Sequence, residues 1–159
     1  MRILVISDTH RYLGNLYEVM EREKDLDAVI HCGDICCIPE DVESITGLPL
    51  YVVAGNCDYD GTLRDEIMPV FQGRKFFVSH GHVYGVNAGT NLIKSIAIDH
   101  GATVVCFGHT HVPLCKEEDG ILIVNPGSLS SPRQSNRKPS YAVLTLLDNG
   151  EVTCQHYYL

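Results

Sequence analysis

Long hydrophobic runs are missing from this sequence. Its apolar stretches are strand-sized, whereas a transmembrane helix needs about 20 consecutive apolar residues. The first residues also lack the basic start, the longer apolar stretch and the cleavage site of a signal peptide. We therefore expect a cytoplasmic protein with no membrane partner.

Positive charge is scarce as well. The chain has 12 Lys and Arg against 20 Asp and Glu, which gives a formal net charge of −8. A mostly acidic surface repels a phosphate backbone, so no duplex nucleic acid is expected as a partner. Bound cations would reverse the sign locally, which leaves a small phosphorylated molecule or a strand end open.

The sequence also shows no sign of disulfide-paired cysteines. The chain has seven cysteines, an odd number, and without an export signal they are read as reduced thiols rather than a disulfide framework. Cys32, Cys36 and Cys37 cluster in sequence, but they lack the two paired thiols of a separate zinc site.

The hydrophobic pattern predicts an α/β protein. The 159 residues suit one domain, 1–159, with one core. The first half predicts a strand, helix, strand, helix and strand, over Arg2–Ile6, Asn15–Lys24, Asp27–His31, Pro39–Ile45 and Leu50–Ala54. This alternation is typical of a parallel sheet covered by helices.

The second half predicts mainly strands. A hairpin is expected from Ile67–Phe71 and Lys75–Ser79, and a helix from Asn87–His100, closed by Gly101. Further strands are expected over Thr103–Phe107, Leu114–Lys116, Ile121–Val124, Tyr141–Leu147 and Val152–Tyr157.

Side chains able to bind a metal follow the predicted strands. They come after five different strands and comprise Asp8, His10, Asp34, Asn56, His80, His109 and His111. Ligands of open α/β sheets gather beyond the carboxyl ends of the strands, so these residues should meet at one edge. Gly33, Gly55 and Gly108 precede three of them and are expected to permit tight backbone turns.

The residue types favour two divalent cations. Two ions about 3.5–4 Å apart need a bridging oxygen, and Asp34, alone between the other pairs, is the candidate bridge. Imidazole combined with carboxylate and amide oxygen, without a thiolate, favours Mn, with Fe, Zn or Ni as alternatives, over Ca.

The order of these motifs resembles the calcineurin-like metallophosphoesterase superfamily. The motifs are Asp8-x-His10, Gly33-Asp34, Gly55-Asn56, His80-Gly81 and Gly108-His109-x-His111. Asn125-Pro126-Gly127-Ser128, followed by Pro132-Arg133, resembles the small, cap-free phosphodiesterase branch of bacteria and archaea. Each motif alone is weak, but five in order, each after a predicted strand, are specific.

The resemblance implies a four-layer αββα sandwich, with two mixed sheets packed face to face and helices outside. It implies that Asp8, His10 and His111 hold one ion, that Asn56, His80 and His109 hold the other, and that Asp34 bridges them. A hydroxide between the ions would attack phosphorus in line and hydrolyse a small phosphate ester. Asp34, Asn56, His80 and Cys57 then form the catalytic group.

The chain departs from the family at two positions. Gly55-Asn56-Cys57-Asp58 stands where the family usually has Gly-Asn-His followed by an acid, and Arg11 stands where relatives often have Gly. A thiol is a weak hydrogen-bond donor, so Cys57 is expected at the substrate without being the main acid. Arg11 and Arg133 are candidate phosphate-binding residues, with solvated surface arginines as the alternative.

Other readings stay open. The small subunit of the eukaryotic retromer is similar to the same fold used as a protein-binding scaffold, with a degraded metal site. All seven ligand positions of this chain carry a competent ligand, which favours catalysis over the scaffold. A phosphomonoesterase is the rival among enzymes, and homo-oligomerisation is not decided. His31 is interpreted as structural or as a support for a ligand, and Asp58 as an anchor for a ligand or for loop geometry. For His82, a place near the substrate and a place away from it both stay open. Asn125 to Ser128 are interpreted as support for the site floor.

Overall fold

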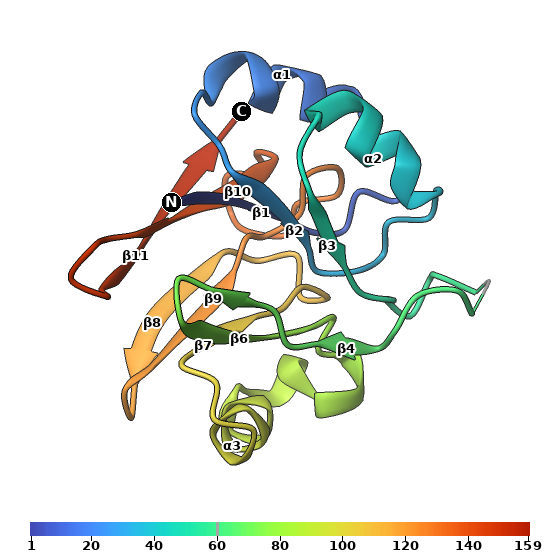
Figure 1. Ribbon diagram of the computed structural model, residues 1–159. Helices are drawn as coiled ribbons and strands as arrows, with labels where there is room; N and C mark the ends of the chain where they lie inside the picture. Colours follow the sequence, from blue (N-terminus) through green and yellow to red (C-terminus); the bar gives the residue numbers. More distant parts are fainter. Residues whose placement is uncertain (60) are drawn as a thin grey trace.

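The computed structural model describes residues 1–59 and 61–159, and it contains two β-sheets packed face to face (Figure 1). Helices α1 (Gly14–Arg22) and α2 (Pro39–Thr46) cover the outer face of one sheet, and α3 (Asn91–Asp99) covers the outer face of the other. The predicted four-layer αββα arrangement is therefore confirmed. No helix in the described ranges is both long and apolar enough to cross a membrane.

The first sheet has the order β11-β10-β1-β2-β3. Its strands are β1 (Arg2–Ile6), β2 (Ala28–His31), β3 (Leu50–Val52), β10 (Ser140–Leu146) and β11 (Val152–Tyr158). Strands β1, β2 and β3 are parallel, and the register places Ile6 beside His31 and His31 beside Val52. The three loops that follow these residues therefore leave the sheet at the same edge.

The second sheet has the order β4-β6-β7-β9-β8, with β5 paired to β6. Its strands are β4 (Glu66–Ile67), β5 (Val70–Phe71), β6 (Arg74–Ser79), β7 (Val104–Cys106), β8 (Leu114–Glu118) and β9 (Ile121–Asn125). Strands β6 and β7 are parallel, with Val78 beside Cys106, so the loops that carry the later histidines also leave together.

Both faces of the central strands are buried, which explains their unbroken apolar sequences. On β1, Ile3 and Val5 join the cluster between the sheets, while Leu4 and Ile6 join the cluster under α1 and α2. A third cluster, which includes Phe77 and Val105, lies under α3. The core holds the two sheets, and hence the loops at their ends, in fixed relative positions.

Two predicted elements differ from the structure. The strand expected over Ile67–Phe71 is two short strands, β4 and β5, because Pro69 lies between them and has no N–H to donate to a ladder. The helix expected from Asn87 begins only at Asn91, after a 3₁₀ turn over Val86–Ala88. Gly89, with φ 136°, interrupts the helical conformation there.

Candidate metal centre

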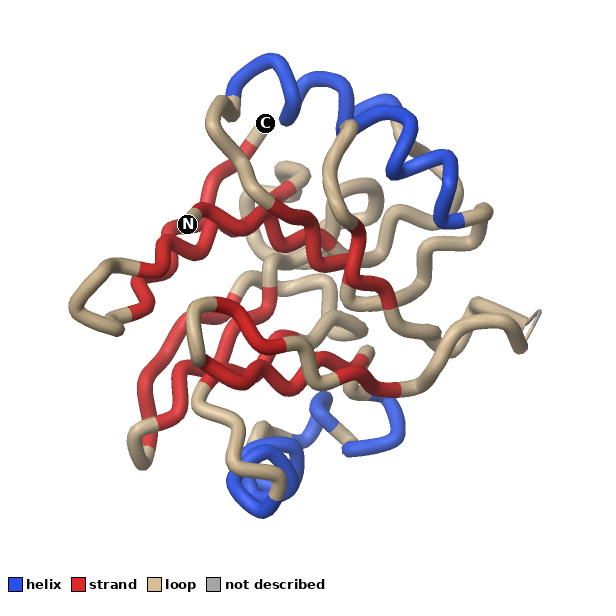
Figure 2. The backbone as a smooth tube through the Cα atoms, in the orientation of Figure 1, coloured by secondary structure: helices blue, strands red, loops and turns tan. Residues whose placement is uncertain are grey.

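The seven predicted ligand residues lie in loops that follow β1, β2, β3, β6 and β7, at the ends of both sheets (Figure 2). Backbone hydrogen bonds join the first two of these loops. Asp8 N donates to Gly33 O at 3.0 Å, and His10 N donates to Asp34 O at 2.9 Å. The parallel register of β1 and β2 thus continues beyond the strands and sets the ligand loops side by side.

Asp8, His10 and His111 form one group of donors, with one ligand atom of each within 4.8 Å of the others. His111 Nε2 lies 3.0 Å from Asp8 Oδ1. Asp8 is fully buried, yet its Oδ1 accepts no hydrogen bond from any described residue. A buried carboxylate oxygen without a donor, facing two imidazoles, is a group that a cation would satisfy.

Asn56, His80 and His109 form the second group. Asn56 Oδ1 lies 3.1 Å from His80 Nε2 and 2.9 Å from His109 Nδ1. Two imidazole nitrogens and an amide oxygen therefore converge on a common point, as ligands of a divalent cation do.

Asp34 lies between the two groups. Its Oδ2 is 3.5 Å from His80 Nε2 and 3.9 Å from His10 Nε2. Asp34 also shares a cluster of ligand atoms with Asp8 and His80. The structure thus brings all seven predicted residues together, with a carboxylate at the centre, and the donor set fits two neighbouring divalent cations.

The surroundings of Asp34 keep its carboxylate ionised. Burial opposes the charged form of Asp34, but hydrogen bonding to His80, the charge of His80 and the Cys57 N–H, at 2.8 Å from Oδ1, hold its pKa well below the usual range. Burial also opposes the charged form of His80, yet the hydrogen bond to Asp34 and the charges of Asp8 and Asp34 raise the pKa of His80. Burial lowers the pKa of His109.

Five of the seven ligand residues have left-handed backbone conformations. The φ values are 54° for Asp8, 44° for His10, 54° for Asp34, 67° for His109 and 59° for His111. Such conformations are unfavourable for side chains with a Cβ, and they concentrate at functional sites, where the surrounding structure holds them.

The three glycines act in two different ways. Gly33 has φ 92°, so the predicted tight turn is correct at that position. Gly55 and Gly108 do not have positive φ, yet a tight turn begins at each, since Asp58 N donates to Gly55 O at 3.2 Å and Thr110 N donates to Gly108 O at 2.7 Å. A Cβ on Gly55 would lie 2.1 Å from Asp34 Oδ1, and one on Gly108 would lie 2.0 Å from Ser7 Oγ. These two glycines allow close packing of the loops.

Other side chains orient the donors. His80 Nδ1 lies 2.7 Å from Cys32 O, and His111 Nδ1 lies 2.6 Å from Ser131 O, so in each ring Nε2 faces the centre. The Asn87 amide lies 2.9 Å from His109 Nε2 and leaves Nδ1 toward Asn56. Asn87 was not predicted, because it was placed inside a helix that in fact begins four residues later, and Gly89 is the signal that could have ended that helix sooner.

The predicted support by Asn125 to Ser128 is confirmed. Asn125 Nδ2 donates to Gly108 O at 2.8 Å, and its Oδ1 accepts from Gly127 N. Ser128 Oγ donates to Asp8 O at 2.8 Å, and so does Ser130 Oγ, which the sequence analysis did not single out. These bonds hold the backbone on both sides of the first donor group.

The predicted substrate-binding residues border the centre. Arg11 and Arg133 are exposed; Arg11 Nε donates to Cys36 O at 3.1 Å, and Arg133 Nη1 donates to His109 O at 3.4 Å.

The Cys57 thiol lies within 4.8 Å of ligand atoms of His10 and Asp34, so this sulfur, which was not among the predicted metal ligands, is within reach of a bound ion. Burial, then Asp34, raises the pKa of Cys57 and keeps its thiol neutral. His82 packs against His80 and His109.

His31 is structural, as interpreted from the sequence. It is fully buried, accepts a hydrogen bond at Nδ1 from Gly33 N at 3.2 Å, and lies 3.0 Å from Thr9 Oγ1 through Nε2. Thr9 in turn donates to Ile35 O. The ring thus links the loop that carries Asp8 and His10 to the loop that carries Asp34, and burial lowers its pKa to about 4.

This pKa predicts a pH dependence of stability in the metal-free protein. The unfolded chain binds a proton at His31 below about pH 6.5 and the folded chain does so only below about pH 4, so the free energy of unfolding falls as the pH is lowered through this window. The shift corresponds to a loss on the order of 3 kcal/mol. Urea unfolding of His31→Asn, which keeps an acceptor for Gly33 N–H, should show a correspondingly flatter profile. The same change at exposed His100 serves as the control, and parallel profiles for His31→Asn and the unmodified protein would contradict the expectation.

Comparisons with known proteins agree with this geometry. The family model described as the calcineurin-like phosphoesterase superfamily domain matches residues 1–149. The probable metallophosphoesterase YsnB of Bacillus subtilis (strain 168) is 38% identical over 160 residues, which cover 99% of this chain and 90% of that protein. Phosphodiesterase MJ0936 of Methanocaldococcus jannaschii is 30% identical over 146 residues, covering 80% of this chain and 83% of that protein.

A comparison with solved structures also finds a similar fold. The crystal structure of wild-type Vps29 from Entamoeba histolytica, complexed with Zn²⁺, has a TM-score of 0.80 at 21% identity and covers 99% of each chain, which is a likeness of fold alone. The family model and YsnB together cover nearly the whole chain. The protein therefore belongs to the calcineurin-like phosphoesterase superfamily.

Proposed function

We propose that the protein is a divalent-metal-dependent phosphodiesterase that hydrolyses a small phosphate ester in the cytoplasm, without a duplex nucleic acid or a membrane as partner. The observation that carries the proposal is the position of Asp34, whose carboxylate lies between two groups of three competent donors. Family membership supports ester hydrolysis, and the name of the 30% identical relative supports a diester.

The donors divide between two ions in this proposal. Asp8, His10 and His111 would hold one ion, Asn56, His80 and His109 would hold the other, and Asp34 would be a ligand of both. Mn is the proposed metal, with Fe, Zn and Ni as alternatives, because the set mixes imidazole with carboxylate and amide oxygen. When bound, the ions neutralise charge on the phosphoryl oxygens and activate water for attack on phosphorus.

The protein's own side chains position the ester. Arg11, in the loop after β1, and Arg133, in the loop after β9, are suited to hold phosphoryl oxygens, since a guanidinium binds two of them at once. Cys57 holds Asp34 through its backbone N–H, and its neutral thiol is a poor acid. The leaving group is therefore one that departs with little protonation.

Metal dependence and ester preference are tested together. Metal-free protein is mixed with increasing Mn²⁺, and the hydrolysis of bis(p-nitrophenyl) phosphate is compared with that of p-nitrophenyl phosphate. We expect no turnover before addition of the metal, saturation at two ions per chain, and kcat/KM about tenfold higher for the diester. A higher kcat/KM for the monoester would replace the proposed activity by a phosphomonoesterase.

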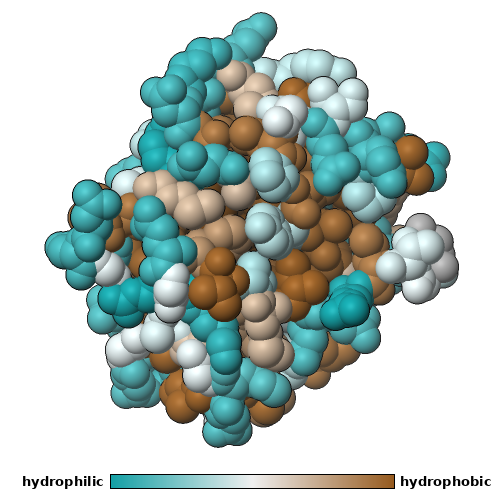
Figure 3. Space-filling view, viewed as in Figure 1, coloured by the Kyte–Doolittle hydropathy of each residue, from teal (hydrophilic) through white to brown (hydrophobic). Residues whose placement is uncertain are grey.

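A protein-binding scaffold is the second candidate. Apolar surface occupies the middle of the face in Figure 3, with hydrophilic side chains around it, and such surface is typical of contact with another protein. Two bound Mn²⁺ ions without turnover of either ester would favour the scaffold, because its metal site would then serve binding alone.

Cys57→His tests the leaving-group interpretation. An imidazole donates a proton more readily than a neutral thiol, so the variant should keep the rate for p-nitrophenyl esters and hydrolyse an alkyl ester about tenfold faster. The measurement is kcat for a p-nitrophenyl ester and for an alkyl diester under Mn²⁺ saturation. A large fall in both rates would show that the thiol itself is needed.

A further inference from the structure

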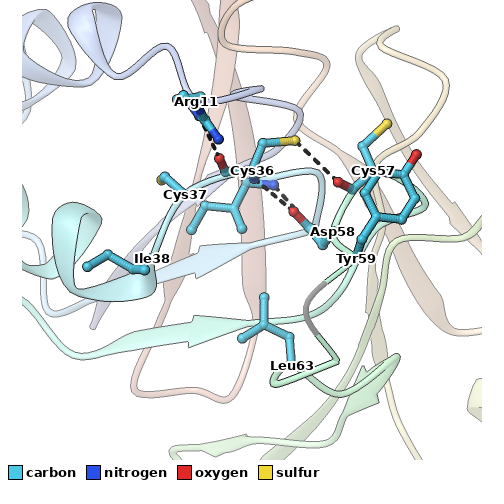
Figure 4. A pocket seen from close by; sticks show the side chains of 9 residues that line it. Arg11, Cys36, Cys37, Ile38, Cys57, Asp58, Tyr59 and Leu63 are labelled. Atoms are coloured by element: carbon cyan, nitrogen blue, oxygen red, sulfur yellow. Dashed lines mark hydrogen bonds between the residues drawn. The ribbon is translucent and has the colours of Figure 1, made fainter.

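A cavity of about 320 Å³ opens beside the metal centre. Figure 4 shows Arg11 above it, Ile38 on the left, Leu63 below, and Cys57 and Tyr59 together on the right. These residues come from the loop after β1, the loop that enters α2, and the loop after β3. The cavity is therefore built from the same loops that carry Asp8, Asp34 and Asn56.

The cavity and the metal centre share a wall. Cys36, which lines the cavity, has its Sγ 3.8 Å from His10 Nδ1. Cys57, which also lines it, has its thiol within 4.8 Å of ligand atoms of His10 and Asp34. A group attached to a phosphate at the metal centre would therefore lie next to residues that line the cavity.

The lining is suited to an uncharged, flat group. Tyr59 is 87% exposed and Ile38 is 57% exposed, so both offer apolar surface that is not used in the core. Asp58 is the acid in the wall, but its carboxylate accepts hydrogen bonds from the backbone N–H groups of Gly55, Ile35 and Cys36. This carboxylate is occupied within the fold, and Arg11 adds a cation at the rim, so a cationic group is disfavoured.

We propose that this cavity binds the organic substituent of the ester and that this substituent contains an aromatic ring, such as an aryl group or a nucleobase. The inference rests on the proposed function, because it assumes that the phosphate lies at the metal centre. The ring packs against Tyr59 and Leu63, and the volume of the cavity accommodates one ring system but not a polymer.

Two phosphonates that differ only in their organic group test the proposal. Binding of phenylphosphonate and of methylphosphonate to the Mn²⁺-loaded protein is measured by calorimetry, which needs no turnover. We expect phenylphosphonate to bind about tenfold more tightly, because its ring leaves water for the apolar lining. Leu63→Trp, which fills the cavity, and Tyr59→Ala, which removes one wall, should each reduce this ratio to about two or less.

Tyr17→Ala is the matched control, because Tyr17 is 60% exposed and lies on α1, outside the cavity lining. It should keep the tenfold ratio. Equal affinities of the two phosphonates for the unmodified protein, or the same loss of ratio in Tyr17→Ala, would overturn the cavity proposal and leave the phosphodiesterase intact. If the loaded protein binds neither phosphonate and hydrolyses no ester, the proposed function itself fails.

Discussion

Asp34→Asn is expected to lower kcat for the diester by about a thousandfold and to weaken binding of the second Mn²⁺ ion. The Asp34 carboxylate lies between the two donor groups, 3.5 Å from His80 Nε2 and 3.9 Å from His10 Nε2. Its depressed pKa keeps it ionised at every working pH, so the substitution removes a full negative charge. An amide oxygen is neutral, so it would be a weaker ligand for two cations than the ionised carboxylate.

The variant tests the bridge separately from the fold. Asn retains the shape of Asp, and urea unfolding of the metal-free variant should remain close to that of the unmodified protein. Calorimetric titration with Mn²⁺ and the rate with bis(p-nitrophenyl) phosphate are measured on the same preparation. Asp99→Asn, at the exposed end of α3, is the matched control and should change neither quantity. Two tightly bound ions and a normal rate in Asp34→Asn would refute the proposed centre.

The ligand residues could be predicted because a simple rule of topology applies to them. Asp8, Asp34 and Asn56 each follow an apolar strand, and the carboxyl ends of parallel strands meet at one edge. His109 follows β7 in the same way in the second sheet. The rule needs only the strand positions and the polar residue after each strand, and both can be read from the sequence.

The contacts that orient the ligands could not be predicted. Asn87 lies close to His109 and precedes a helix that begins only after Gly89, whereas the expected helix ran through this glycine. The need for glycine at 55 comes from the approach of Asp34 Oδ1, a contact between loops 21 residues apart. Local pattern specifies elements and their ends, whereas such contacts depend on how separate loops pack.

Asp58 illustrates the intermediate case, since its anchoring role was predicted but its partners were not. Its Oδ1 accepts from Cys36 N at 2.8 Å, and its Oδ2 accepts from Gly55 N at 2.8 Å and from Ile35 N at 3.3 Å. One carboxylate therefore joins the loop that carries Asp34 to the loop that carries Asn56. The relative position of the proposed bridge and of the second donor group depends on this carboxylate.

Asp58→Ala should therefore weaken both stability and metal binding. Three backbone N–H groups in a partly buried place lose their acceptor, which costs about 3 kcal/mol in the free energy of unfolding. Loss of a residue that orients ligands typically weakens metal binding by about 10–100-fold, so Mn²⁺ affinity should fall within that range. Asp58→Asn keeps one acceptor oxygen and should lie between Asp58→Ala and the unmodified protein in both measurements, whereas Asp99→Ala should match the unmodified protein. Normal Mn²⁺ affinity in a destabilised Asp58→Ala protein would mean that the ligand loops hold their positions without this carboxylate, and the metal ions themselves would then be the stronger link between the loops.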